Sequence, residues 1–403
     1  MATAASVVPA HVPATLVHDV DPFNLEGGGE DLFGAWGRVQ RSTPDIYFSP
    51  YCGGFWVLNR ARMIAEVVAD HERFSSVGGV TIMAMPPDFT PFPPLMVDPP
   101  THGYFRKPLS LALGPQSLQK LGVRAREIVT ELIDRTYARG ECEFMQEFAL
   151  YVPVAILMSI FGLPFSDSER LIPLADKVNR SSDAAERGAA IAAIGAYAEE
   201  WINARRQDPG EDLASKFLRV MVGDRPISHE ETVSMMTVLL IGGLDSVSHT
   251  MGAIMRFLAE NPEHRRRLAE QPALIAEALD ELLRRHSVAA TARVVTRDMS
   301  FEGVEMKAGD RIFICPWLYG LDPEAWDDAM EVRMDRHPRE IMSFGKGVHR
   351  CVGANLARLE IRTLLEEWLK RIPEFHITPG RKPVTMLGQT MATVSLPLSW
   401  PTS

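Results

Sequence analysis

The sequence predicts a mainly helical protein with a minor antiparallel β component. Residues 117–139 and 167–206 place apolar side chains at the three- and four-residue spacing of helices. A longer segment, 228–261, contains no proline, and its part from Val233 to Leu244 contains no charged side chain. Short segments with the pattern of strands follow in the last third of the chain. Helix therefore dominates, and strands are confined to a small part of the fold.

Composition and charge favour one ordinary globular domain. The chain has 403 residues, of which 46% are hydrophobic and 23% charged, so disorder is not expected. Its formal net charge of -10 argues against a nucleic-acid partner, which needs a positive patch. Residues 1–20 carry neither a basic region nor a long apolar run, so we expect a flexible N-terminal arm followed by a single domain over 21–403. The four cysteines form no CxxC pair, which favours a reducing cytoplasm, and no membrane segment is expected.

The segment 228–261 is the predicted centre of the fold. Ser228 followed by Glu231 is a capping-box pattern that marks a helix start. A helix of this length would span roughly 50 Å at ~1.5 Å per residue, the width of a whole domain. Gly242 and Gly243 lie in the middle of it, at a cost of about 1 kcal/mol each relative to alanine. Such a cost indicates a compensating role at this point of the helix.

Further elements are expected in the order of the chain. Helices are predicted at 262–271, at 272–287 and from just after Cys351 to about residue 371. Strands are predicted at 292–296, 299–301, 311–315, 375–377 and 394–398, with turns at Gly303 and Gly309.

The sharpest local pattern is FGKGVHRCVG at residues 344–353. Its glycines allow a tight loop close to a large planar ligand, and Cys351 ends that loop just before a helix. Free N–H groups at the helix N-terminus are expected to stabilise a thiolate and lower the pKa of Cys351. Such a thiolate is a good axial ligand for ferric haem. The alternative is a buried structural cysteine beside an ordinary turn.

This segment resembles the haem-binding loop of the cytochromes P450, whose ligand to the haem iron is a cysteine thiolate. The resemblance implies that Cys351 binds the iron of haem b, and that Phe344, Gly345 and Gly353 shape the loop around the cofactor. It covers about residues 21–400 and is greatest to the soluble bacterial branch and its camphor hydroxylases. It implies the P450 fold, with a long central helix over the haem.

A second match is the Glu-x-x-Arg pattern of Glu281 and Arg284, which resembles the family's structural ion pair behind the haem. At positions i and i+3 of a helix, the two side chains share a face. The resemblance implies a third, arginine member of this network, for which Arg333 and Arg336 are both candidates.

A third match is GGLDS at residues 242–246, in the central helix. In the resembled family the two glycines border the haem and make room for dioxygen, while an acid and a hydroxyl residue relay protons. The resemblance therefore implies that Asp245 and Ser246 are catalytic, and that Arg180 pairs with Asp245 and gates proton entry. Serine stands where the family usually has threonine. The alternative is ordinary helix packing around a buried aspartate.

Four basic residues resemble the family's clamp on the two haem propionates. They are His102, Arg106, Arg293 and His349. Carboxylates need positive partners, and Arg293 stands alone among apolar neighbours in a predicted strand. For each of the four residues the alternative is an ordinary surface charge.

The resemblance also implies a pocket for a small apolar substrate. Its expected lining comes from the loop around residues 80–95, the central helix and two later segments: Thr81, Met83, Met85, Phe89, Thr90, Phe92, Val238, Ile241, Leu244, Val288 and Thr390. No tyrosine lies between Tyr51 and Tyr104, whereas camphor hydroxylases use one to bind the substrate ketone, and only Thr90 falls near that position. A terpenoid or norisoprenoid is therefore expected, with an aromatic compound as the alternative.

The activity implied by the resemblance is that of a monooxygenase, which takes dioxygen and receives electrons from a [2Fe-2S] ferredoxin. No GxGxxG follows a predicted strand, so no nucleotide-binding segment is expected in the chain. Lys107, Lys346, Arg350 and Arg106 would make the face near Cys351 basic and steer the ferredoxin. Alternatives are a haem-thiolate peroxygenase, which would usually lack the acid–hydroxyl pair, and a non-catalytic haem sensor. A monomer is expected.

Overall fold

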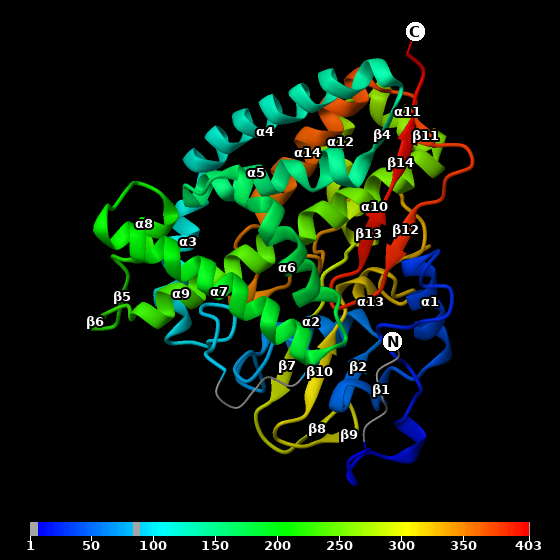
Figure 1. The fold of residues 1–403 in the computed structure, drawn as a ribbon. Helices are drawn as coiled ribbons and strands as arrows, with labels where there is room; N and C mark the ends of the chain where they lie inside the picture. The colour runs from blue at the N-terminus through cyan, green and yellow to red at the C-terminus, as the bar shows by residue number, and fades with distance from the viewer. Residues whose placement is uncertain (1–6, 84–88, 403) are drawn as a thin grey trace.

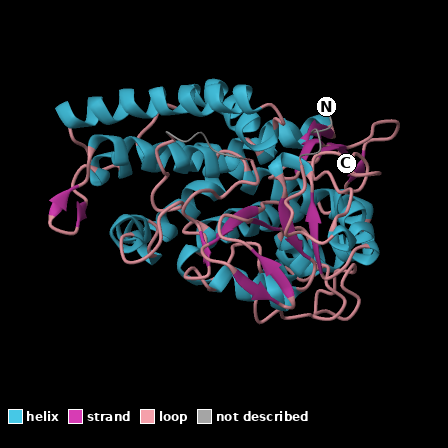
Figure 2. Cartoon of the chain, turned by 90° about the horizontal axis from the view of Figure 1, so that it is seen from below, coloured by secondary structure: helices cyan, strands magenta, loops and turns pink. Residues whose placement is uncertain are grey.

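Helices make up most of the fold, and strands form a smaller region beside them (Figure 1). The computed structural model describes residues 7–83 and 89–402. Figure 2 shows the long helices stacked along one side of the molecule and most of the strands gathered on the other. The prediction of a mainly helical fold with minor antiparallel β structure is confirmed.

The α-helices are distributed along the chain from the N-terminal region to residue 371. They are α1 (Leu32–Ser42), α2 (Ala61–Ala69), α3 (His102–Ala112), α4 (Pro115–Thr136), α5 (Tyr151–Phe161), α6 (Ser168–Arg180), α7 (Ala184–Gln207), α8 (Leu213–Phe217), α9 (His229–Gly243), α10 (Ser246–Glu260), α11 (Pro262–Glu270), α12 (Leu274–Arg285), α13 (Pro316–Gly320) and α14 (Ala354–Arg371). Among the shorter turns, η4 (Met145–Ala149) precedes α5, and η6 (Gly347–His349) lies just before α14.

The largest sheet joins the N-terminal region to a segment that follows α12. Its order is β1 (Ile46–Ser49), β2 (Phe55–Leu58), β10 (Arg311–Ile314), β7 (Thr291–Val295) and β3 (Phe74–Ser75). Its neighbours are antiparallel except β2 and β10, which run parallel. A second sheet has the order β11 (His376–Ile377), β14 (Pro397–Ser399) and β4 (Glu141–Glu143). The described pairs are β12 (Val384–Met386) with β13 (Ala392–Ser395), β5 (Met221–Val222) with β6 (Arg225–Pro226), and β8 (Met299–Phe301) with β9 (Val304–Met306).

Three apolar clusters hold these elements together. One lies between the N-terminal region and the large sheet, the second packs α4, α10 and α14 around Trp368, and the third lies among α5 to α9. Residues 229–260 are long and apolar enough to cross a membrane, but 67% of their apolar window is buried inside the protein. This stretch therefore packs as a core helix.

The predicted central helix is interrupted at its glycines. Its start is as expected: Ser228 Oγ accepts the Glu231 N–H at 3.0 Å, and the Glu231 carboxylate accepts the Ser228 N–H at 2.8 Å. α9 ends at Gly243 and α10 begins at Ser246. Asp245 between them has φ −129° and ψ −60°, outside the helical region. The single helix expected over 228–261 is therefore wrong in this detail, because the backbone bends where side chains are missing.

Two other predicted elements are divided in the structure. The helical pattern at 167–206 forms α6 and α7, because the Asp183 side chain accepts the N–H groups of Ala185 and Glu186 and so starts a new helix. The strand expected at 394–398 comprises the end of β13 and the start of β14, which belong to different sheets.

The described part of the expected N-terminal arm lies against the large sheet. The Val12 side chain is buried, and Val17 forms a backbone bridge with Phe48 of β1. His11 Nε2 lies 2.9 Å from the Asp310 carboxylate just before β10. These contacts were not predicted, because the sequence of residues 1–20 indicated only that a targeting segment is absent.

Candidate active site

The predicted cysteine loop is a tight turn against α2. Gly345 and Gly347 have φ values of +64° and +69°, which favour glycine. A Cβ atom at Gly347 would lie 3.3 Å from Ala69 Cα, so a side chain there would crowd the backbone of α2. The Cys351 N–H donates to the Phe344 carbonyl at 2.8 Å and closes the loop. α14 then begins at Ala354, as the pattern predicts.

The Cys351 side chain is exposed, whereas Cys142 and Cys315 are buried. Desolvation by the surrounding protein raises the pKa of the Cys351 thiol, and the Gly353 N–H and the positive charge of Arg106 oppose this shift only in part. The expectation that the loop by itself lowers this pKa is therefore wrong, because desolvation outweighs the donors. A coordinating metal ion deprotonates a thiol outright, so iron binding would supply what the loop lacks.

The four residues of the predicted propionate clamp include a close pair of imidazoles. The rings of His102 and His349 are 4.8 Å apart, and His349 Nε2 lies 2.7 Å from Asp98 Oδ1. His102 is 5% exposed, and its Nε2 has no hydrogen-bond partner among the described residues. Arg293 is 4% exposed and donates to the backbone carbonyl of Ala292. A buried ring nitrogen without a partner costs free energy unless a ligand satisfies it.

Charge around this cluster is unbalanced in the positive direction. Burial, followed by His349 and Arg106, lowers the pKa of His102 to about 4. Burial likewise lowers the pKa of Arg293 to about 10, with Asp98 as the opposing carboxylate. Additional carboxylates would therefore be favoured here. Together with one thiol ligand on a glycine-rich loop, this donor set fits a haem that carries two carboxylates.

The break between α9 and α10 leaves room on one side and packs closely on the other. A Cβ atom at Gly242 would meet nothing within 4 Å, whereas one at Gly243 would lie 2.8 Å from Leu157 Cδ1 of α5. Ser246 Oγ donates to the Gly242 carbonyl at 3.2 Å. Gly243 thus lets α5 approach, and Gly242 keeps the opposite side free of a side chain. This is the arrangement that a small diatomic ligand needs beside the helix.

Asp245 is buried at this break and is held by Arg180 of α6. Arg180 Nη2 donates to Asp245 Oδ1 at 2.6 Å, and Nη1 donates to Oδ2 at 3.1 Å. The two side chains are 4% and 5% exposed. Arg180 Nε also donates to Asp176 at 2.6 Å, and the Asp176 side chain is 52% exposed. The predicted pairing of Arg180 with Asp245 is confirmed, and it connects a buried carboxylate to the surface.

His249 is a member of this cluster that sequence reasoning missed. Its Nε2 lies 3.0 Å from Asp245 Oδ1, and its Nδ1 lies 3.1 Å from the Thr393 carbonyl of β13. Burial by itself would raise the pKa of Asp245, but His249 and then Arg180 outweigh it and lower the pKa to about 2. The i, i+4 spacing of Asp245 and His249 was visible in the sequence.

Glu281 and Arg284 form the predicted ion pair and are fully buried. Arg284 Nε donates to Glu281 Oε2 at 2.7 Å, and both side chains are 0% exposed. Arg336 Nε lies 3.2 Å from Glu281 Oε1, whereas Arg333 contributes its backbone N–H at 3.0 Å. Arg336 is therefore the third side chain of the network. Arg284 also donates to the carbonyls of Gly320, Ala329 and Glu331.

The predicted substrate-pocket residues fall into two groups. Backbone hydrogen bonds join the segments that carry Thr81, Met83, Val288 and Thr390: Ala292 N–H to Val80, Ala290 N–H to Gln389, and Met391 N–H to Val288. Phe92, Ile241 and Leu244 belong to the apolar cluster among α5 to α9, and Val238 of α9 is also buried. Phe89 packs edge-on against Phe92, and Met85 lies outside the described residues.

Two details of this region were not expected. Thr90 Oγ1 donates to Glu230 at 2.6 Å, so its hydroxyl is already engaged by the start of α9. Gly388 lies against α6: a Cβ atom there would be 3.0 Å from Arg180 Cγ and 3.1 Å from the Asn179 carbonyl. The segment that carries Thr390 therefore touches the residue that holds Asp245.

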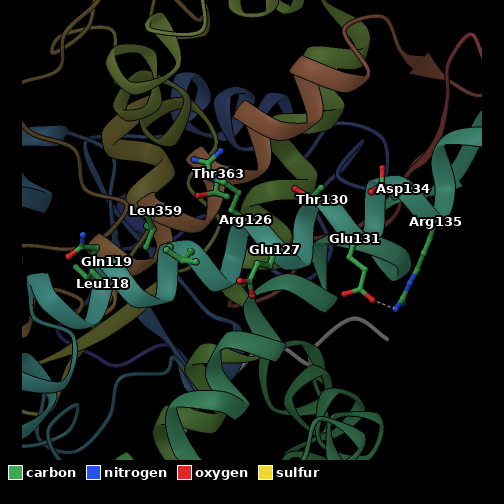
Figure 3. A pocket seen from close by; sticks show the side chains of 12 residues that line it. Leu118, Gln119, Arg126, Glu127, Thr130, Glu131, Asp134, Arg135, Leu359 and Thr363 are labelled. Atoms are coloured by element: carbon green, nitrogen blue, oxygen red, sulfur yellow. Dashed lines mark hydrogen bonds and ion pairs between the residues drawn. The ribbon is translucent and has the colours of Figure 1, made fainter.

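Two surface hollows differ in how they lie relative to the predicted site residues. A groove of about 1030 Å³ runs along α4 and α14, where Leu118, Val123 and Leu359 are among its lining residues (Figure 3). None of the predicted site residues that the structure describes lines this groove, so it is not the candidate site. A smaller hollow of about 220 Å³ lies beside the cysteine loop and is lined in part by Phe344 and Arg350.

Comparison with known proteins gives consistent matches. A model of the family named Cytochrome P450 matches residues 167–400. The protein named "Probable cytochrome P450 127A1" of Sinorhizobium fredii is 32% identical, over 98% of this chain and 97% of its own length. The mycinamicin IV hydroxylase/epoxidase of Micromonospora griseorubida is 30% identical, over 88% of this chain and 91% of its own length. The crystal structure of CYP101C1 superposes with a TM-score of 0.88 at 34% identity, over 98% of this chain and 100% of that chain.

Proposed function

Since this chain belongs to the cytochrome P450 family and is a haem-thiolate monooxygenase, we propose that it hydroxylates a small apolar substrate with electrons from a [2Fe-2S] ferredoxin. A terpenoid or norisoprenoid is the preferred substrate class, and the cofactor is haem b. The observation that carries this proposal is the buried cluster at the break between α9 and α10. There Asp245 is bound by Arg180 and is followed directly by the hydroxyl of Ser246.

In this proposal the positions of the residues assign their roles. Cys351 is the protein ligand of the iron, while His102, Arg106, Arg293 and His349 bind the carboxylates of the porphyrin. When bound, the haem supplies dioxygen activation and one-electron chemistry. Buried cationic groups suit this task because carboxylates are most strongly bound where water is excluded.

Protons are proposed to reach the site through side chains of the break. Asp245 takes a proton that enters past Arg180, and the Ser246 hydroxyl passes a proton toward the space beside Gly242. Ser246 Oγ now donates to the Gly242 carbonyl, so its hydroxyl hydrogen must turn away from that carbonyl to serve this role. Serine can do so more freely than threonine, since it lacks the branch that restricts χ1.

Apolar side chains at the pocket support a small hydrophobic substrate. Val238 is a buried residue of α9. Ile241 and Leu244, at the end of the same helix, belong to one apolar cluster with Phe92. The Thr90 hydroxyl is bound to Glu230, so the predicted hydrogen bond from Thr90 to a substrate carbonyl would require that contact to break. A substrate whose binding depends mainly on apolar contact fits best.

The proposed electron donor docks beside the cysteine loop. Lys107 and Arg350 are exposed, whereas Lys346 pairs with Glu340 at 2.8 Å and is partly neutralised. The 220 Å³ hollow beside the loop adds Arg339 and Arg358 to this face. A cytoplasmic location and a monomeric state complete the proposal, and the thiol state of Cys351 that iron binding needs is maintained in a reducing compartment.

The first test is the difference spectrum of the dithionite-reduced protein with carbon monoxide. A thiolate opposite the gas gives a Soret band strongly shifted to the red of histidine-ligated haem, and this band is expected for the native protein. The Cys351→His variant should keep haem and lose the shift. A histidine-like band from freshly folded native protein would remove Cys351 as the thiolate ligand.

The substrate class and the two alternative functions, a peroxygenase and a non-catalytic haem protein, are tested with the same protein. Cyclic terpenoids, norisoprenoids and simple aromatics are screened for the low- to high-spin shift, and the first two classes are expected to give the larger shifts. Turnover should require NADH, a ferredoxin reductase and a [2Fe-2S] ferredoxin. Product formation with hydrogen peroxide alone, at the same rate, would favour the peroxygenase. Spin-state shifts without any product would favour a non-catalytic haem protein.

A further inference from the structure

His249 is placed so that both ring nitrogens face oxygen atoms. The Thr393 carbonyl lies 3.1 Å from Nδ1, and Asp245 Oδ1 lies 3.0 Å from Nε2. The histidine and aspartate side chains are 6% and 5% exposed. Water therefore has little access to either contact, and the hydrogen bonds of this ring have to be satisfied by the protein.

The chemistry of the two oxygens restricts where protons can lie. A backbone carbonyl only accepts hydrogen bonds, so Nδ1 must carry a hydrogen. The Nε2···Oδ1 contact then needs one further proton, either on the ring or on the carboxyl group. The pair of His249 and Asp245 therefore holds one more proton than a neutral imidazole beside a carboxylate.

Arg180 decides on which side of the contact this proton lies. It donates to both oxygens of Asp245, and a carboxylate accepts two such hydrogen bonds best when it is ionised. His249 and then Arg180 lower the pKa of Asp245 to about 2, against the opposing effect of burial. Asp245 is therefore the anion, and the proton belongs to the ring.

On the basis of the proposed function, we propose that His249 is held as an imidazolium and supplies the proton that Asp245 passes on during turnover. When Arg180 leaves Asp245, the Nε2–H bond breaks and an Oδ1–H bond forms. His249 then remains neutral, with its Nδ1 hydrogen on the Thr393 carbonyl. Solvent returns the missing proton, and the Asp176 end of the Arg180 contact is the exposed side of the cluster. His249 acts through Asp245 and is a positioning residue.

His286 is a natural reference for this assignment, because it is another buried histidine of the same chain. Its Nδ1 lies 3.0 Å from the Leu282 carbonyl, at a geometry similar to that of His249. Burial and then Arg285 lower its pKa well below the ordinary value. His286 should therefore be neutral under conditions in which His249 is charged.

The charge states can be read without substrate from ¹⁵N-labelled histidines by NMR. The reduced, carbon monoxide-bound holoprotein is diamagnetic and suits this measurement, and the His249→Gln variant assigns the signal. At pH 7.5, His249 is expected to show two protonated nitrogens, whereas His286 shows one. In Asp245→Asn, His249 should change to the neutral pattern. A neutral His249 in the native protein, or no change in Asp245→Asn, would overturn the proposal.

Turnover supplies the functional half of the test. The amide introduced by His249→Gln can donate a hydrogen bond to Asp245 but cannot carry the extra proton. The kcat for oxidation of β-ionone, used as a representative norisoprenoid, should therefore fall about tenfold at unchanged KM. The solvent deuterium isotope effect on kcat should rise. An unchanged kcat and isotope effect in His249→Gln would refute proton supply by His249. If the native protein shows the charged His249 signal but forms no product from β-ionone, the result counts against the proposed substrate class instead. The kcat comparison then uses the compound that gives the largest spin-state shift.

Misfolding of the variant has its own control. His249→Gln should keep the red-shifted carbon monoxide band of the native protein, which reports an intact thiolate site. If that band is lost, the variant His249→Asn, with its shorter side chain, replaces His249→Gln in the kinetic comparison. The NMR spectrum of Asp245→Asn still decides the charge of His249.

Discussion

Two buried ionic clusters in this protein have similar components but different surroundings. In one, Glu281, Arg284 and Arg336 meet at the end of α12, and the first two side chains are 0% exposed. In the other, Arg180, Asp245 and His249 meet beside the break in the central helix, at 4–6% exposure. Both contain one carboxylate and more than one basic group.

The clusters differ in what else their arginines bind. Arg284 donates to three backbone carbonyls in addition to Glu281, one at the end of α13 and two in the segment that follows it. Arg180 has no such backbone acceptor among its described contacts, and its second partner is the half-exposed Asp176. The first arginine is fixed by the chain itself, whereas the second is fixed only by side chains.

This difference indicates different purposes for the same kind of ion pair. A buried pair tied to backbone carbonyls fixes distant segments relative to one another and has no alternative arrangement. A buried pair that connects to a surface carboxylate can exchange partners, and in the proposed function this exchange frees Asp245 to accept a proton from another donor. We expect substitutions in the first cluster to affect folding, and substitutions in the second to affect turnover.

The largest effect is expected for Arg284→Met. It leaves Glu281 buried with fewer donors and removes the hydrogen bonds to three carbonyls, so the free energy of unfolding should fall by about 3–5 kcal/mol. Denaturant unfolding of the holoprotein measures this loss. The matched control is Arg135→Ala, which removes an exposed i, i+4 pair with Glu131 and should cost less than about 1 kcal/mol. Equal losses in the two variants would show that the Glu281 network is not a structural anchor.

Asp245→Asn should separate the clusters most clearly. The amide keeps the shape of the side chain but cannot hold a negative charge, so kcat should fall about 100-fold. The carbon monoxide band should remain, and the loss of stability should be smaller than in Arg284→Met, because Arg180 keeps Asp176. Kinetics and denaturant unfolding of one preparation test both parts. A fully active variant would remove Asp245 from the proton path.

The smallest effect is expected for Asp176→Asn. Arg180 then loses its exposed partner and binds Asp245 alone, which should slow proton entry and lower kcat by about threefold. Stability should hardly change, since a half-exposed ion pair contributes about 0–1 kcal/mol. Glu131→Gln, at a similarly exposed helical pair, is the control for kcat. A fall as large as that of Asp245→Asn would mean that Asp176 is itself a relay group.

Local patterns predicted the parts of the site that lie close together in the sequence. The loop at 344–353, the segment 242–246 and the pair of Glu281 with Arg284 each carry their residues within ten positions, so their resemblance to the family's motifs could be seen in the sequence. The choice between Arg333 and Arg336 was open, because it depends on how the segment after α13 folds back onto α12. Arg336 contributes its side chain to the network and Arg333 contributes its backbone N–H.

Contacts between distant segments could not be predicted in the same way. The charge of His249 depends on the Thr393 carbonyl, which lies 144 positions further along the chain. Thr90 meets Glu230 only because the loop before α3 crosses the start of α9. Desolvation of Cys351 is likewise a property of the assembled fold, and the sequence showed only the groups that oppose it.

Gly388 limits how this enzyme can be redesigned. Any side chain at that position would press on Arg180 Cγ and on the Asn179 carbonyl, although the residue lies only two positions before Thr390 of the proposed substrate pocket. Mutant libraries aimed at substrate preference should therefore vary Thr390 and keep position 388 as glycine. A library that includes this position would also displace Arg180, the partner of Asp245, and so mix changes at the proposed pocket with changes at this ion pair.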